Sequence, residues 1–407
     1  MSQSSSVTKT HNNNSAYLVV LAGVCAALHI WKIPPALPEL QRELGFTLLQ
    51  SGFLISVVQF GGMTLGLAAG LFAEKTGLRR CMLMGLFLLA LASACGALFD
   101  SVLALLLFRA IEGAGYLLVV MPAPGLIKRL VDGVYLSRLM GVWGTFFPVA
   151  TVLALLGGSW LLSVSNWRML WWLLAVLTVA MMGLLWRHIP RDTQMPLKDI
   201  AGSASAPLGW EVVKTTLTSR NVWLVALAFA AYSCQWTAII GFLPSIYTQA
   251  GVSGTTAGLL TAVAAGANII GNLSAGRLSH RGVKPLVLLS SGFAGMALSA
   301  LCAFGLGLPA LFQFVAVVAF SALGGLIPAT LFLLGIRLAP SPQTTSTTIG
   351  WLTQCSALGQ FAGPPLVAWA ATLVGDWQWT WVVTGSCALA GIVLATQIRA
   401  QPKLEAR

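Results

Sequence analysis

Long apolar runs separated by short polar stretches make up most of the chain. A helix needs about 20 residues to cross the hydrocarbon layer of a membrane, and twelve of the runs are of that order. The pattern predicts spans at 16–37, 50–72, 81–99, 101–125, 139–162, 168–187, 221–246, 256–277, 284–305, 307–335, 344–373 and 379–398. We therefore expect an all-α membrane protein with twelve transmembrane helices.

One longer polar stretch, 188–220, leaves six predicted spans on either side. It combines the densest charge of the chain with Pro, Gly and Ser, a composition typical of a linker. The predicted organisation is a tail, a six-helix bundle, a linker, a second six-helix bundle and a tail, at 1–15, 16–187, 188–220, 221–398 and 399–407.

The two halves repeat the same backbone plan at a spacing of 206 residues. The matched positions are Pro38 and Pro244, Gly45 and Gly251, Gly52 and Gly258, and Gly70 and Gly276. A weaker match, offset by 210, pairs Asn166-Trp167-Arg168 with Asp376-Trp377-Gln378. A duplicated half in an apolar chain is typical of a transporter with two pseudo-symmetric bundles around a central site.

Composition and charge support a membrane location. Only 8% of the residues are charged, against about 25% in a typical soluble domain. With the N-terminus in the cytoplasm, most Lys and Arg residues fall on the cytoplasmic side, which is the bias that orients membrane proteins. The net charge of +12 is then explained by topology and contact with anionic lipid headgroups, and a nucleic-acid partner is not expected.

Little in the sequence indicates metal, cofactor or enzyme chemistry. The seven cysteines are odd in number, lie in or beside apolar runs and form no CxxC pair, so we interpret them as buried apolar residues. A membrane-embedded enzyme would need clustered His, Asp or Glu within the spans, where only His29 and Glu112 are candidates. We expect no metal, no cofactor and no enzyme, and we interpret the first apolar run as a retained helix rather than a signal peptide.

The turn between the second and third predicted spans carries the first family resemblance. Its marked positions are Gly70, Glu74, Lys75, Gly77, Arg79 and Arg80. The turn resembles the signature loop of the major facilitator superfamily, which implies two six-helix bundles, alternating access and a gating role for these residues. The second copy has His280 at the acidic position, so a gating salt bridge is expected in the first half only. A plain basic turn that obeys the charge rule is the alternative.

Two charges lie within the fourth predicted span. Arg109 is about 12 Å into a helix that starts near Ser101, and Glu112 follows one turn later on the same face. Charge at that depth costs several kcal/mol unless it is paired or hydrated. The pair either lines a cavity or neutralises itself while pinning helices. The segment resembles the family's Arg-x-x-Gln-Gly motif, which implies contact of Arg109 with a proton or a substrate anion, and leaves Glu112 as a titratable group or a counter-ion.

The first span places Cys25, His29 and Lys32 on one face, before Pro34 and Pro35 end or kink the helix. Lys32 either faces a cavity or extends to the outer surface; we favour the cavity. The segments 29–44 and 241–253 resemble bacterial permeases of the cyanate and nitroimidazole group. That group carries an Asn-Leu-Arg-Pro sequence in its first span, which is absent here.

Neutral polar residues in other spans complete the predicted site. The predicted substrate-binding residues are His29, Lys32, Gln59, Arg109, Tyr232, Gln235, Trp236 and Asn268, with Glu112 or His29 as the proton-coupling group. Gln235 is of interest because it lies 206 residues after His29. The fifth span has Leu153 to Gly158 where the antiporter signature would place Gly-Pro-x-x-Gly-Gly, which argues against a drug and proton antiporter.

The predicted function is uptake of a small anionic or polar organic solute by alternating access, with proton coupling left open. Lys32 and Arg109 against Glu112 give the spans a net positive charge, which favours an anion. The alternative is proton-driven efflux of hydrophobic compounds. We expect a monomer in the inner membrane of a bacterium, with both termini in the cytoplasm, and with the solute, a co-transported proton and the lipid bilayer as its partners.

Overall fold

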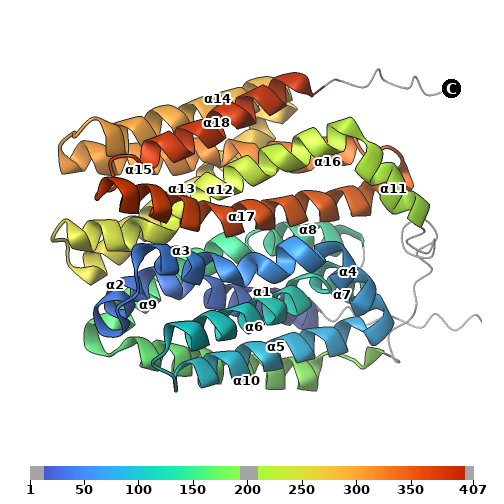
Figure 1. The fold of residues 1–407 in the computed structure, drawn as a ribbon. Helices are drawn as coiled ribbons and strands as arrows, with labels where there is room; N and C mark the ends of the chain where they lie inside the picture. Colours follow the sequence, from blue (N-terminus) through green and yellow to red (C-terminus); the bar gives the residue numbers. More distant parts are fainter. Residues whose placement is uncertain (1–12, 132, 193–209, 399–407) are drawn as a thin grey trace, which may run out of the picture.

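The computed structural model describes residues 13–131, 133–192 and 210–398, and all regular structure in these ranges is helical (Figure 1). The first half contains α1 (Asn13–Trp31), α2 (Ile33–Leu44), α3 (Leu48–Ser56), α4 (Phe60–Thr76), α5 (Leu78–Gly96), α6 (Val102–Val120), α7 (Ala123–Leu130), α8 (Gly133–Trp143), α9 (Phe146–Val164) and α10 (Trp167–His188). The second half contains α11 (Trp210–Thr218), α12 (Arg220–Gln249), α13 (Gly254–His280), α14 (Pro285–Ala300), α15 (Ala310–Gly324), α16 (Leu326–Arg337), α17 (Thr345–Val374) and α18 (Thr380–Gln397).

Twelve helical stretches in the described ranges are long and apolar enough to cross a membrane, as predicted. Several consist of two helices that meet at a break within the span. The first breaks at Lys32, just before Pro34 and Pro35, and then continues past its predicted end at 37 to Leu44. The second contains a 3₁₀ turn at Val57–Gln59. Proline at the start of a helix is favourable because its missing N–H would have no partner there, so the chain resumes as a helix where the sequence suggested an end.

The spans form two six-helix bundles, with α1 to α10 in the lower half of Figure 1 and α12 to α18 in the upper half. The halves meet where α2 packs on α12, where α3 and α4 pack on α17, and where α9 packs on α13. The outer surface is apolar: Val164 and Leu311 are each 69% exposed. A surface of this kind is stable in lipid and not in water.

The sequence repeat has a structural counterpart at the loops. Gly45 and Gly251 both adopt the left-handed conformation, with φ of 66° and 86°. The two tryptophans of the weaker sequence match also make equivalent contacts. Trp167 Nε1 donates to Glu43 Oε2 at 2.9 Å, and Trp377 Nε1 donates to Gln249 Oε1 at 2.8 Å. Because Glu43 and Gln249 are again 206 residues apart, the repeat includes tertiary contacts as well as backbone turns.

Candidate functional site

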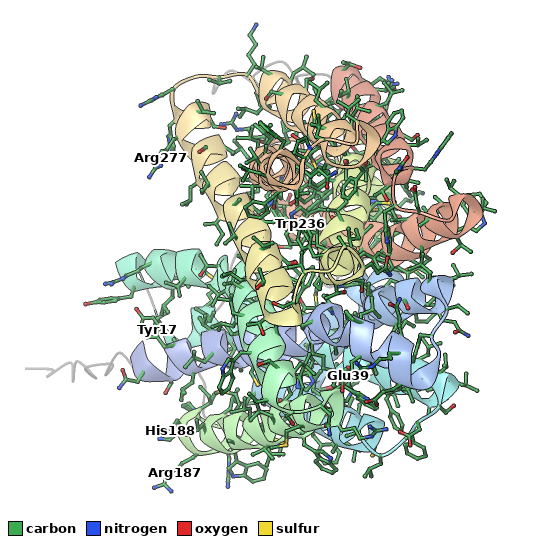
Figure 2. The ribbon with its side chains drawn as sticks, turned by 90° about the vertical axis from the view of Figure 1, so that its left-hand side faces the viewer. Tyr17, Glu39, Arg187, His188, Trp236 and Arg277 are labelled. Carbon is green, nitrogen blue, oxygen red and sulfur yellow. The ribbon has the colours of Figure 1, made fainter. Side chains whose placement is uncertain are left out.

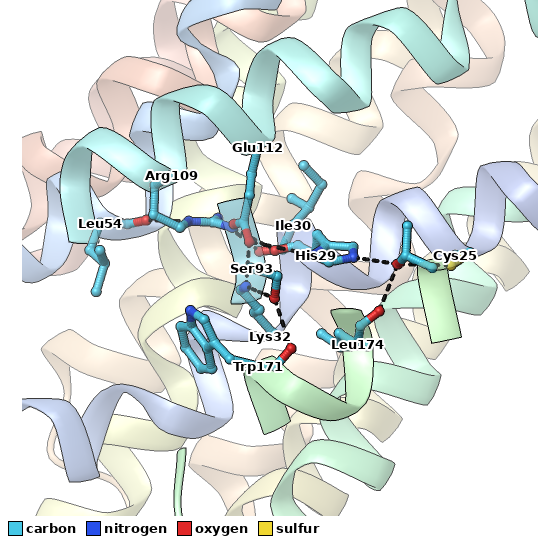
Figure 3. A network of polar contacts seen from close by, with 11 residues as sticks. Cys25, His29, Ile30, Lys32, Leu54, Ser93, Arg109, Glu112, Trp171 and Leu174 are labelled. Atoms are coloured by element: carbon cyan, nitrogen blue, oxygen red, sulfur yellow. Dashed lines mark hydrogen bonds and ion pairs between the residues drawn. The ribbon is translucent and has the colours of Figure 1, made fainter. Parts of the chain in front are cut away.

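A fully buried cluster of charged side chains lies inside the first half, with Glu112 of α6 at its centre (Figure 3). The Glu112 carboxylate pairs with the Lys32 ammonium, accepts from Arg109 Nη1 at 2.7 Å and lies 3.4 Å from His29 Nδ1. All four residues are between 0% and 1% exposed. Charges so far from water persist only when they are paired and hydrogen-bonded, and here each has several partners.

The side chain of Lys32 points into the first half and not toward the membrane surface. Its Nζ donates to Ser93 Oγ at 3.0 Å and lies 4.2 Å from the centre of the Trp171 ring. The Ser93 hydroxyl in turn donates to the Trp171 carbonyl at 2.9 Å. The ammonium is therefore held by a carboxylate, a hydroxyl and an aromatic face. In this structure Lys32 does not extend to the outer surface of the membrane.

Arg109 joins the helix break in the first span to the rest of the cluster. Its guanidinium donates to the carbonyls of His29 at 2.6 Å, Ile30 at 3.2 Å and Leu54 at 3.2 Å. In a continuous helix, the Ile30 carbonyl would accept from the residue four positions later, but Pro34 has no N–H to donate. Arg109 supplies the missing donor, so the prolines create the backbone site that a buried arginine satisfies.

The surroundings of His29 define where a proton can reside. The Thr178 hydroxyl donates to the Leu174 carbonyl at 2.7 Å, which leaves its oxygen to accept from His29 Nε2 at 2.8 Å. His29 Nδ1 then faces the Glu112 carboxylate. Without a proton between them, the lone pairs of His29 Nδ1 and the Glu112 carboxylate repel each other. A proton shared by these two atoms turns the contact into a hydrogen bond. The geometry thus has room for one proton between the His29 ring and the Glu112 carboxylate.

The second half holds a neutral polar network in place of charges. Asn268 Nδ2 donates to Tyr232 Oη at 2.9 Å and to the Ser321 carbonyl at 3.0 Å, and Trp236 Nε1 donates to Ser321 Oγ at 3.0 Å. Gln235 donates to the carbonyl of Ala231 in its own helix. Trp236 lies within the upper half in Figure 2. Its ring meets that of Trp31 edge to face, with centroids 5.5 Å apart, across the boundary between the halves.

A small cavity of about 80 Å³ lies where α4 and α6 of the first half meet α17 of the second. Gln59 Nε2 crosses the boundary here and donates to Gln360 Oε1 at 2.9 Å. The described residues that line the cavity include no charged side chain. They are Gln59, Gly62, Gly66, Tyr116, Leu117, Val120, Met121, Gly350, Thr353, Gln354, Ala357 and Gln360.

The predicted site residues thus lie in three places. His29, Lys32, Arg109 and Glu112 form the buried cluster; Gln59 lines the cavity; and Tyr232, Gln235, Trp236 and Asn268 lie in the second half. Sequence reasoning missed Tyr116, Gln354 and Gln360. Glutamine within an apolar span, opposite glycines four residues apart at Gly62 and Gly66, was the available signal. In the described ranges, no three His, Cys, Asp or Glu side chains lie close enough to hold a metal ion.

The predicted gating turn contacts its own half. Asp192, just after α10, accepts from the backbone N–H groups of Arg79 at 3.0 Å and Arg80 at 3.2 Å, at the start of α5. Arg79 Nη2 donates to the Trp186 carbonyl at 2.6 Å. Gly77 adopts φ 98°, and a Cβ there would lie 2.4 Å from Asp192. The side chains of Glu74 and Lys75 and the surroundings of Gly70 lie outside the described structure. The gating role of this turn therefore stays a prediction.

Comparison with known proteins agrees with this architecture. The family model described as Major Facilitator Superfamily matches residues 19–364 and 225–406. The multidrug transporter MdfA of Yersinia pestis is 25% identical over 347 residues, covering 74% of this chain and 84% of MdfA. An uncharacterized MFS-type transporter of Mycobacterium tuberculosis is 32% identical over 153 residues. That match covers 36% of this chain and spans only 22% of the relative's length.

Among solved structures, a bacterial homolog of the human lysosomal transporter Spinster, in an inward-facing and unoccupied conformation, superposes with a TM-score of 0.74. The match covers 96% of this chain and 95% of that chain at 16% sequence identity. At this identity the likeness concerns the fold alone.

Proposed function

This chain belongs to the major facilitator superfamily of secondary transporters, and we propose that it exports uncharged, largely apolar compounds in exchange for protons. The halves would alternate between two arrangements, each opening the boundary between them to one side of the membrane. The observation that carries the proposal is the chemistry of that boundary. Its cavity offers amide, hydroxyl and apolar groups and no charge.

The charged cluster has the properties of a coupling site rather than of a solute site. Lys32 and Arg109 already have the Glu112 carboxylate and several uncharged acceptors as partners. Of the described residues of this cluster, neither cation is therefore free to bind an anion at the boundary. The contact between His29 and Glu112 can exchange a proton, and Tyr116, which lines the cavity, lies one helical turn from Glu112 on α6. A structural change caused by proton binding in the cluster could thus be transmitted to the cavity through α6 alone.

The relatives add independent support for efflux. Two of them are described as multidrug transporters, MdfA and the MdtP protein of Bacillus subtilis, the latter 25% identical over 154 residues. The absence of the Gly-Pro antiporter signature in the fifth span argues in the opposite direction, so the proposal depends on the boundary chemistry.

Uptake of a small anionic or polar organic solute is the second candidate. It is favoured by the charge of the cluster, in which two cations face one carboxylate. If a conformational change exposed Lys32 or Arg109 to the boundary, an anion could replace part of the Glu112 pairing. The resemblance to cyanate and nitroimidazole permeases belongs with this candidate.

Transport in proteoliposomes separates the two candidates. Radiolabelled chloramphenicol serves as the uncharged solute and radiolabelled benzoate as the anion, each with and without an imposed proton gradient. We expect accumulation of chloramphenicol that requires the gradient and disappears with a protonophore. Accumulation of benzoate alone would favour the second candidate, and transport of neither would contradict both.

Variants of the cluster test the coupling. His29→Gln keeps a donor for Thr178 and removes the titratable ring, so we expect gradient-driven accumulation to fall at least tenfold. Glu211→Gln, on the exposed side of α11, is the matched control that also removes an ionisable group and should transport normally. Unchanged coupling in His29→Gln would exclude the His29 and Glu112 pair as the proton site.

A further inference from the structure

Three side-chain amides are among the groups that line the cavity at the boundary. Gln59 enters from the first half, and Gln354 and Gln360 enter from α17 of the second. Each amide group carries both donors and an acceptor and no charge. A group that matches this wall must likewise be uncharged and must both donate and accept hydrogen bonds.

The protein itself contains an example of such a group bound to α4. Gln354 Nε2 donates to the Met63 carbonyl at 2.8 Å, and its Oε1 accepts from the Leu67 N–H at 3.2 Å. These two backbone groups are four residues apart in α4, so they lie one helical turn apart on the same side of the helix. The absence of a side chain at Gly66 makes room, because a Cβ there would lie 3.2 Å from Gln354 Oε1.

Two polar groups at the cavity still lack partners. In the described structure, the hydroxyl of Tyr116 makes no hydrogen bond although its residue lines the cavity, and Gln59 uses its amide nitrogen on Gln360 while its Oε1 bonds to nothing. A ligand that supplies one donor and one acceptor would satisfy both.

The size of the cavity limits what it can hold. Its volume of about 80 Å³ is several times the roughly 10–15 Å³ that one water requires. It is well below the roughly 300 Å³ at which ligand pockets for whole drug-sized molecules begin. It therefore fits a small polar group at one end of a larger solute.

We propose that this cavity is a subsite for the carboxamide group of the exported compound. The ligand N–H donates to Gln59 Oε1, and the Tyr116 hydroxyl donates to the ligand carbonyl. The inference rests on the proposed function and narrows it from uncharged apolar compounds to those with an amide or an equivalent N–H and carbonyl pair.

Binding of four matched naphthalenes to the purified full-length protein in detergent, followed by intrinsic tryptophan fluorescence, tests the subsite. The probes are naphthalene-2-carboxamide, its methyl ester analogue methyl naphthalene-2-carboxylate, naphthalene-2-carboxylate and 2-ethylnaphthalene. We expect the carboxamide to bind about tenfold more tightly than the ester, as the loss of one buried hydrogen bond predicts. The carboxylate should bind more weakly than both. Equal affinity for carboxamide and ester, or preference for the carboxylate, would overturn the subsite.

Two variants distinguish the two hydrogen bonds. Gln59→Met should bring the affinity for the carboxamide to that of the ester and leave the ester unchanged. Tyr116→Phe should weaken the carboxamide and the ester alike, by about tenfold, with no effect on 2-ethylnaphthalene. The matched control Tyr17→Phe removes a hydroxyl from a residue that is 39% exposed at the start of α1 and should change none of the affinities.

The result is separable from that of the transport assay. Gradient-driven chloramphenicol transport with no preference for the carboxamide would retain the proposed function and overturn the subsite. Loss of the carboxamide preference in Tyr17→Phe as well would also overturn it, because the effect would not be local to the cavity.

Discussion

The two halves of this transporter share a backbone and differ in the chemistry inside it. In the first half, the interior polar group is the charged cluster of His29, Lys32, Arg109 and Glu112. In the second half, it is the neutral network of Tyr232, Trp236, Asn268 and Ser321. His29 and its counterpart Gln235 show the divergence at a single position, since one is titratable and the other is not. Of these two described positions, only the one in the first half carries a side chain that can bind a proton near neutral pH.

The contacts that remained equivalent are those at the ends of the helices. Trp167 with Glu43 and Trp377 with Gln249 hold equivalent loops in the same way. Rocking of one bundle against the other requires each bundle to move as a rigid body, and these contacts fasten the loops to the helix ends within each half. The functions that we propose for the two interiors require them to differ. The first half would bind the coupling proton, and the second would supply part of the uncharged wall around the solute.

Removal of the acid at the centre of the cluster should have the largest effect. Glu112→Gln leaves Lys32 and Arg109 as buried cations without a counter-ion, and breaking a buried pair in this way costs about 3–5 kcal/mol. We expect a large fall in the unfolding midpoint of the purified protein in detergent. The double variant Glu112→Gln with Lys32→Met should recover much of the loss because it also removes one orphaned charge. A single variant as stable as the wild type would mean that the cluster is hydrated or rearranges easily.

The basic turns offer a second comparison between the halves. Gly77 and Gly282 both have positive φ, 98° and 84°, so alanine at either position strains the backbone by about 1–3 kcal/mol. Only at Gly77 would the new Cβ also collide with Asp192, which caps α5. Gly77→Ala should therefore lower stability by about 1 kcal/mol more than Gly282→Ala, the value of a lost cap. Equal midpoints in thermal unfolding would show that the Asp192 contact adds no stability.

The fold was predictable because it depends on features that the sequence displays directly: apolar run length, the spacing of glycines and prolines, and the charge at the turns. The site was predictable only in part. Arg109 and Glu112 are separated by three residues on one helix, so their pairing follows from helix geometry. That Lys32 and His29 join them, while Gln59 faces α17 instead, depends on how the helices rotate and pack, which no local pattern encodes. Tyr116 appeared as one more residue in an apolar span.

Breaking the neutral network of the second half should lower stability less than breaking the charged cluster of the first. Asn268→Leu removes the donor to Tyr232 and Ser321 and the acceptor for Asn272 Nδ2, at 2.8 Å. Hydrogen bonds between membrane helices contribute about 0.6 kcal/mol on average and at most about 1.7, so we expect a loss of about 1–2 kcal/mol. The effect should be the same at pH 5 and pH 8, because no member of the network titrates in that range. A loss as large as that of Glu112→Gln would contradict the contrast between the halves.

The smallest effect should come from making one loop of the first half resemble its counterpart in the second. Arg168 pairs with Glu43 and Asp100 at the surface, and its side chain is 34% exposed; the matching position in the second half is Gln378. Exposed ion pairs contribute about 0–1 kcal/mol. Arg168→Gln should therefore shift thermal unfolding only slightly, and less at high salt, because the Trp167 contact to Glu43 remains. A shift that rivals that of Gly77→Ala would mean that this ion pair, and not the tryptophan shared by both halves, holds the loop in place.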